Sequence, residues 1–124
     1  MNWLPILFAL NFSLLLLHEM DAIRAKEWKM FIFLKDMKEQ NGYVLFSVLH
    51  LPLYFWVIFT ISQIWSGGAG YALVYLLTDI FLIVHAVIHF FFRKHAENRM
   101  NAAYSMILIY GMGALSIAHL SLLF

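Results

Sequence analysis

Residues 71–92 read YALVYLLTDIFLIVHAVIHFFF, and this stretch decides the fold. It contains one acidic residue, Asp79, and neither lysine nor arginine. A helix needs roughly 20 predominantly apolar residues to cross the hydrocarbon core of a bilayer. A run of this length and composition therefore predicts a membrane-spanning helix.

Two further runs have the same character, residues 43–65 (YVLFSVLHLPLYFWVIFTISQIW) and residues 102–124 (AAYSMILIYGMGALSIAHLSLLF). Pro52 predicts a kink in the first of these. Another apolar run, WLPILFALNFSLLLL, begins at Trp3 and continues as HEMDAIRAKEW without a break in helical spacing. No basic segment precedes it and no small-residue cleavage site follows, so we expect a helix and not a signal peptide.

Composition agrees with four spans. Hydrophobic residues make up 64% of the 124 residues and charged residues 12%, which leaves too little polar surface for a soluble globule of this size. We expect one all-α integral membrane domain over residues 1–124, a four-helix bundle with spans at about 3–22, 43–65, 71–92 and 102–124.

Basic residues set the expected orientation. All eight lysines and arginines lie within residues 24–38 and 93–99, whereas the linker at 66–70 carries no charge. Cytoplasmic linkers are enriched in lysine and arginine. The first and third linkers are therefore expected in the cytoplasm, with both termini outside.

The first linker alternates basic and acidic residues around an apolar run that includes Trp28. Over residues 24–39 this pattern predicts an amphipathic helix lying along the cytoplasmic interface, with docking of a partner protein as the alternative. Residues 40–42 (QNG) and 66–70 (SGGAG) are typical of turns.

Four of the six histidines fall in one layer of the predicted bundle. Counted from the cytoplasmic end of each span at 1.5 Å per residue, His50 and His85 lie roughly 10 Å deep and His89 roughly 5 Å deep. His18 closes the first apolar run at a similar level, with Asp21 three residues later on the same face. His85 and His89 share a face because they are spaced i, i+4.

Ionisable side chains inside a membrane are costly and mark functional sites. Neutral imidazole binds zinc and iron, and three or four such ligands satisfy a four- or five-coordinate ion. The sequence therefore predicts a divalent metal ion, zinc or iron, held by five residues: His18, Asp21, His50, His85 and His89. Glu19 and Asp21 are the candidate catalytic residues, because a carboxylate beside the ion can move protons. A metal-free polar network is the alternative.

Common metal motifs do not match this layer. The zinc-protease motif H-E-x-x-H would need a histidine at Ala22. Carboxylate-bridged di-iron bundles need more acidic residues than Glu19 and Asp21. A mononuclear site, or a compact pair of ions with few protein ligands, is expected.

Three segments of the sequence resemble those of a known protein family. The segment LLLLHEMDAIRAKEW, a histidine in the second span and the segment HAVIHFFFR resemble a family of small four-span bacterial membrane proteins known as a domain of unknown function. The chain is also remotely similar to membrane proteins with an N-terminal H-x-x-E-E motif, here with Asp21 and Ala22 in place of the two glutamates. The resemblance implies the fold and a bacterial inner-membrane location, and almost nothing of function.

Other polar and small residues bear on partners. We expect Asp79 near the bilayer midplane, protonated or hydrogen-bonded to Tyr75, Thr78 or Asn11, and His119 at the outer interface. Small side chains on the last helix predict packing within the bundle or, alternatively, a homodimer: Gly111, Ala114, Ala118 and Ser121. The lipid bilayer is the expected partner, and nothing indicates nucleic acid.

Several functions remain open. The first is a metal-dependent enzyme that acts near the lipid headgroups. The second is a protein that binds or transports a metal ion or protons by way of Asp79 and His119. A haem protein with axial His50 and His85 is a third, and a metal-free structural or regulatory subunit is a fourth.

Overall fold

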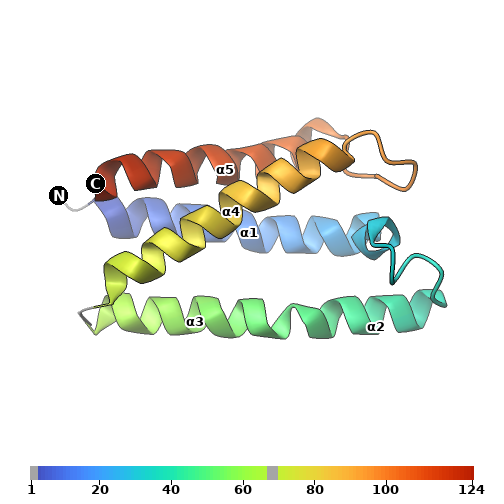
Figure 1. Ribbon diagram of the computed structural model, residues 1–124, viewed down its shortest axis with the longest axis horizontal. Helices are drawn as coiled ribbons and strands as arrows, with labels where there is room; N and C mark the ends of the chain where they lie inside the picture. Colours follow the sequence, from blue (N-terminus) through green and yellow to red (C-terminus); the bar gives the residue numbers. More distant parts are fainter. Residues whose placement is uncertain (1–2, 67–69) are drawn as a thin grey trace.

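The computed structural model describes residues 3–66 and 70–124 (Figure 1). These residues form helices joined by turns, in the order α1 (Trp3–Ala25), the 3-10 turn η1 (Glu27–Met30), α2 (Glu39–Leu49), α3 (Leu51–Trp65), α4 (Tyr71–Phe92) and α5 (Ala103–Leu123). Over this part of the chain, four helical stretches are long and apolar enough to cross a membrane, with α2 and α3 together forming the second. The predicted all-α four-helix bundle is confirmed.

Helix α5 forms the most extensive contacts of the bundle, with α1 along one side and α4 along the other. In Figure 1, α1 and α5 run side by side, α4 crosses them obliquely, and α2 and α3 follow one another along the opposite edge. Gly113 permits a close approach of α5 to α4, since a Cβ atom there would lie 3.0 Å from the Cβ of Ala86.

Both basic linkers lie at one end of the bundle, which we call the basic end (Figure 1). The start of α1, the end of α3, the start of α4 and the end of α5 lie at the other end. Hairpin-like connections between consecutive spans produce this alternation. It is the arrangement that the charge pattern requires if both basic linkers share one side of a membrane.

The predicted kink at Pro52 is confirmed. The helix is interrupted at His50, between α2 and α3, because Pro52 has no N–H to donate to the carbonyl of Val48. The N–H of His50 instead donates to the carbonyl of Ser47 at 3.2 Å. The break leaves the His50 side chain at the joint of the two helices.

The first linker differs from the predicted interfacial helix. After α1 the chain passes through Lys26 in a left-handed conformation (φ 55°), makes the short turn η1 and continues in further turns to residue 38. The apolar side chains divide between two environments, because Phe31, Ile32 and Phe33 are exposed whereas Trp28, Met30 and Leu34 are buried. Tertiary packing of these buried side chains therefore replaces the amphipathic helix.

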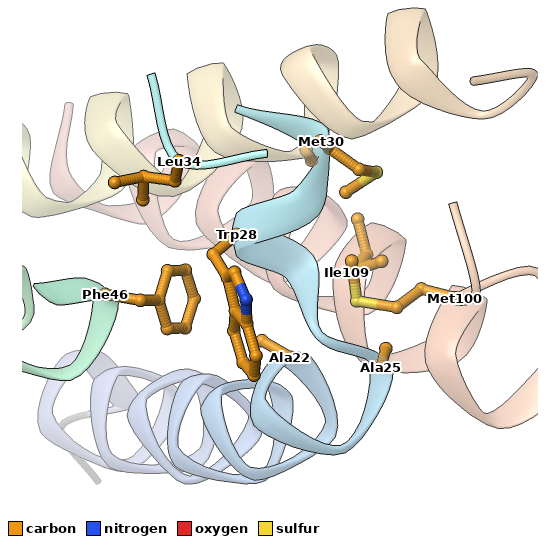
Figure 2. Packing of buried hydrophobic residues seen from close by; sticks show 9 residues of the cluster. Ala22, Ala25, Trp28, Met30, Leu34, Phe46, Met100 and Ile109 are labelled. Carbon is orange, nitrogen blue, oxygen red and sulfur yellow. The ribbon is translucent and has the colours of Figure 1, made fainter. Parts of the chain in front are cut away.

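Trp28 closes the basic end of the bundle. Figure 2 shows its indole standing between Phe46 of α2 and Ala22 of α1, with Met30 and Ile109 beyond it. The ring centroids of Trp28 and Phe46 lie 5.6 Å apart. The linker thus packs against the basic end of the bundle and covers the buried polar residues there.

Gly42 explains a second difference from the sequence prediction. Residues 40–42 lie in the first turn of α2 and do not form a separate turn. A Cβ atom at Gly42 would lie 2.9 Å from Cδ1 of Trp28, so only glycine leaves space for the indole. The residue serves close packing and not chain reversal.

The small-residue stripe of the last helix does not pack within the bundle. Ala114, Ala118 and Ser121 are exposed, and of the four residues only Gly111 faces α1, where an added Cβ would meet Leu14 at 3.5 Å. The prediction of packing within the bundle is therefore wrong for this face. The homodimer remains a prediction.

An apolar layer divides the interior of the bundle. It consists of four buried side chains, one from each span: Leu15, Val57, Leu82 and Met112. Along α1 this layer lies between Asn11 and His18, and along α4 between Asp79 and His85. Two groups of buried polar residues are separated by it.

Candidate metal centre

Three of the four predicted histidines meet at the basic end. His18 comes from α1, and His85 and His89 come from successive turns of α4. One ring nitrogen of each lies within 4.8 Å of the other two. The i, i+4 spacing on α4 and the α1–α4 approach thus place three imidazoles around one point.

Burial of this cluster is deep but incomplete. His18 is fully buried and His89 is 5% exposed, whereas His85 is partly exposed. The rings meet edge to face, with centroids 4.9 Å apart for His18 and His85 and 5.0 Å apart for His18 and His89. The observation that favours a shared ligand is the mutual proximity of one nitrogen from each ring, within 4.8 Å.

The closest contact joins Nε2 of His18 to Nε2 of His85 at 2.8 Å. One nitrogen must carry a proton for this contact to be a hydrogen bond, and the other offers its lone pair. Nδ1 of His18 is buried and has no hydrogen-bond partner among the described residues. No hydrogen bond at Nδ1 therefore selects the tautomer of His18. Its Nε2 can present a lone pair to a cation.

The chemistry of the donor set fits a metal ion. A zinc ion binds histidine nitrogen at roughly 2.0–2.1 Å, which places two ligand nitrogens roughly 3.3 Å apart in a tetrahedral site. The His18–His85 contact of 2.8 Å would therefore open by about 0.5 Å when an ion replaces the shared proton.

A carboxylate that the sequence did not identify completes the cluster. Glu27 is 6% exposed, with Oε1 3.3 Å from Nε2 of His89 and Oε2 4.0 Å from Nε2 of His18. The left-handed conformation of Lys26 ends α1 and turns the following residue under the bundle. Helical spacing did not identify Glu27 as a site residue, because it lies in a linker, where a charged side chain is usually exposed to solvent.

His50 lies beside the cluster and binds a different partner. Its Nε2 lies 2.7 Å from Oε2 of Glu19, and its Nδ1 lies 2.6 Å from the carbonyl oxygen of Phe46. Both ring nitrogens of His50 thus face acceptors, so the His50–Glu19 pair must share a second proton. Such a pair can exchange a proton with a neighbouring molecule.

Asp21 faces α5 instead of the histidines. Its Oδ1 accepts hydrogen bonds from Nε and a terminal nitrogen of Arg24, at 2.8 and 2.7 Å, and its Oδ2 accepts one from Oγ of Ser105 at 2.5 Å. The structure therefore brings His18, His85 and His89 together, and places Asp21 and His50 in hydrogen bonds with other residues.

Two openings reach the cluster. A groove of about 810 Å³ between α3 and α4 extends to Glu19, Glu27, His50 and His85. A smaller cavity of about 230 Å³ at the basic end extends to His89 and is lined by Arg93 and Lys94. The site is thus accessible from the apolar flank and from the basic end.

A second polar group lies beyond the apolar layer. Nδ1 of His119 lies 2.6 Å from Oδ2 of Asp79, and both side chains are at most 1% exposed. Asn11 donates a hydrogen bond to Oγ of Ser116 at 2.7 Å in the same region. Asp79 is hydrogen-bonded as predicted, but its partner is His119 and not Tyr75, Thr78 or Asn11. His119 itself is buried within the bundle. Nothing in residue spacing predicts a pair formed across two helices.

The fold and this site define a class, an all-helical bundle of four apolar spans with a buried histidine cluster at one end. A family model matches residues 4–124 of the chain, and the family is DUF6713, a family of unknown function. The chain belongs to that family, which confirms its predicted membership in a domain family of unknown function. No curated protein and no solved structure matches the chain.

Proposed function

We propose that this protein is a membrane metalloenzyme whose ion is held by His18, His85 and His89. The observation that carries the proposal is the convergence of three imidazoles, with one nitrogen of each within 4.8 Å of the others. Three histidines and an open position are the ligand arrangement of catalytic zinc sites. Zinc is the ion that this donor set favours, and iron is the alternative.

Electrostatics supports a cation at this point. Glu27 and Glu19 bring two carboxylates to the cluster, while Arg24 is bound to Asp21. Among the described residues, the ion-pair partners of Glu19 and Glu27 are histidines, and a dication would offset the charge of these buried carboxylates. Glu27 is placed to bind the ion directly or through a water molecule.

A bound ion would supply a polarised water or substrate oxygen. The residues of this chain supply proton transfer. The Glu19–His50 pair shares a proton and lines the same groove as His85, so it is placed to give or take a proton from a molecule in that groove. The hydrogen bond from Ser105 of α5 to Asp21 holds α1 against α5 and thereby positions His18.

Access supports an enzyme over a transporter. The site has one opening on the apolar flank and one at the basic end, whereas the apolar layer of Leu15, Val57, Leu82 and Met112 separates it from Asp79 and His119. A transported ion would have to cross that layer. By the charge of the linkers, the site faces the cytoplasmic leaflet of the membrane.

Elemental analysis of the purified protein tests the ligand set. We expect one ion per chain in the wild type, loss of the ion in His85→Ala and His89→Ala, and retention in His95→Ala, which changes an exposed linker residue. His50→Ala should retain the ion, because its imidazole is bound to Glu19. Absence of metal in all samples, including protein supplied with zinc or iron during purification, would refute the proposal.

A further inference from the structure

The groove beside the histidine cluster has two chemically different parts. Its walls are apolar side chains such as Leu53 of α3 and Leu77 and Phe81 of α4. Its volume of about 810 Å³ falls in the range of roughly 300–1,000 Å³ found for ligand sites. Leu77 is 44% exposed on the outer surface of a span, so the groove opens toward the hydrocarbon of the bilayer.

The inner end of the groove is polar. Glu19, Glu27, His50 and His85 contribute to its lining, and all four lie at the level of the histidine cluster. Among the described residues, neither lysine nor arginine lines this groove. Without the ion of the proposed function, a negatively charged headgroup such as a phosphate would meet two carboxylates and no basic side chain. With a dication bound, the charges of Glu19, Glu27 and the ion offset one another, so the polar end carries no net positive charge to attract an anion.

We propose that the groove binds a neutral long-chain lipid, with its alkyl chain along Leu53, Leu77 and Phe81 and an uncharged oxygen function, an alcohol or an ester, at the polar end. The inference deepens the proposed function, on which it rests, because it names the substrate class of the same site. An alkyl chain matches the apolar walls, and a hydroxyl or carbonyl oxygen can hydrogen-bond to His85 and the Glu19–His50 pair.

Other occupants fit less well. An apolar helix of a second copy would cover the walls but would bring no polar group to the Glu19–His50 pair at the inner end of the groove. Hydrocarbon from bulk lipid would do the same. A polar group at the end of a chain is what the two parts of the groove require together.

Photo-crosslinking in vesicles tests the inference. The probes are a long-chain alcohol that carries a diazirine on its alkyl chain and the matching alkyl phosphate, added to protein in phosphatidylcholine vesicles. We expect the alcohol to label residues of the groove, unlabelled alcohol to compete in a saturable manner, and the alkyl phosphate to label much less. Adducts are assigned by mass spectrometry of peptides from α3 and α4.

A matched pair of variants supplies the control. Leu77→Trp fills the groove, whereas Ile80→Trp adds the same ring three residues along α4, at a residue of similar exposure (46%) that is not among the described residues lining the groove. Labelling should be lost in Leu77→Trp and kept in Ile80→Trp. If Leu77→Trp does not fold, saturable competition by unlabelled alcohol on the wild-type protein still tests whether the groove is a specific site.

The outcomes separate this inference from the proposed function. Labelling that does not saturate, that is equal in both variants, or that favours the phosphate overturns the inference, even where the protein contains a stoichiometric metal ion. Saturable, groove-specific labelling of protein that lacks metal supports the lipid site and overturns only the metalloenzyme. Metal content is therefore measured on the same samples.

Discussion

The two buried polar groups of this bundle are both built around histidine and differ in which atoms meet. Beyond the apolar layer, His119 is paired with Asp79 at 2.6 Å, in a closed environment where both side chains are at most 1% exposed. At the basic end, three imidazoles face one another, and the closest contact is between two nitrogens. In the first group an imidazole nitrogen meets a carboxylate oxygen, while Nε2 of His119 and Oδ1 of Asn11 have no hydrogen-bond partner among the described residues. In the second group two imidazole nitrogens meet, and this contact requires a proton or a cation between them.

The two polar groups also differ in how accessible they are. The histidine cluster is reached by two openings, and one of its members, His85, is partly exposed. The Asp79–His119 pair lies among Phe8 and Tyr75, whose rings contact the imidazole. We therefore expect the closed Asp79–His119 pair to stabilise the fold, and the accessible cluster of three histidines to bind a ligand. This contrast gives five expectations.

The largest effect on stability should come from Asp79→Leu. Removal of one partner of a buried ion pair leaves the other uncompensated and costs about 3–5 kcal/mol. The double variant Asp79→Leu/His119→Leu should recover most of this loss. The free energy of unfolding in mixed detergent micelles measures both. A double variant no more stable than the single one contradicts the closed-pair description.

Metal should stabilise the protein through the other group. At a free zinc concentration of about 100 times Kd, binding to the folded state alone adds about 2.7 kcal/mol. His85→Ala should lose this increment, while Asp79→Leu/His119→Leu should keep it. Thermal unfolding with and without zinc makes the comparison. An equal response of His85→Ala and the wild type would place the ion elsewhere.

Closure of the basic end depends on Gly42. Gly42→Ala places a Cβ against the indole of Trp28 and should destabilise the fold by about 1–3 kcal/mol, the cost of overpacking a core. Gly70→Ala is the control, because nothing lies within 4 Å of a Cβ added there. Thermal unfolding of both variants measures the difference. If Gly70→Ala loses as much stability, the indole contact is not the cause.

Zinc binding should weaken on acidification. A histidine binds zinc only when the ligating nitrogen is deprotonated, so protons compete with the ion. The zinc-dependent gain in stability is therefore expected to be full at neutral pH and to fall as the pH is lowered from neutral into the acidic range. Unfolding with and without zinc across this range tests the sign. A gain that grows toward acidic pH would exclude histidine ligation.

The smallest effect is expected for Arg24→Ala. The arginine binds the buried carboxylate of Asp21, but its own side chain is 61% exposed, and exposed ion pairs contribute roughly 0–1 kcal/mol. Ser105 keeps its hydrogen bond to Asp21 in this variant. Metal content should remain that of the wild type. Loss of the ion would instead make Asp21 part of the ligand set, as its position beside His18 in the sequence had suggested.

The sequence predicted the residues that carry the site better than it predicted their partners. His18, His85 and His89 were placed in one layer from depth and helical spacing, and the structure brings them together. Glu27 was not predicted, because its burial depends on a left-handed turn at Lys26 and on Trp28 packing over it. The pairing of His50 with Glu19 also depends on contact between two different helices.

What the sequence by itself determined is the all-helical class and the number of apolar spans. Both follow from local composition, since a run of about 20 apolar residues must satisfy its backbone within one helix in a membrane. Only the tertiary structure decided which polar side chains meet, which carboxylate lies beside which histidine, and where a groove opens. Those outcomes depend on how helices distant in sequence pack against each other, and helical periodicity carries no information on that.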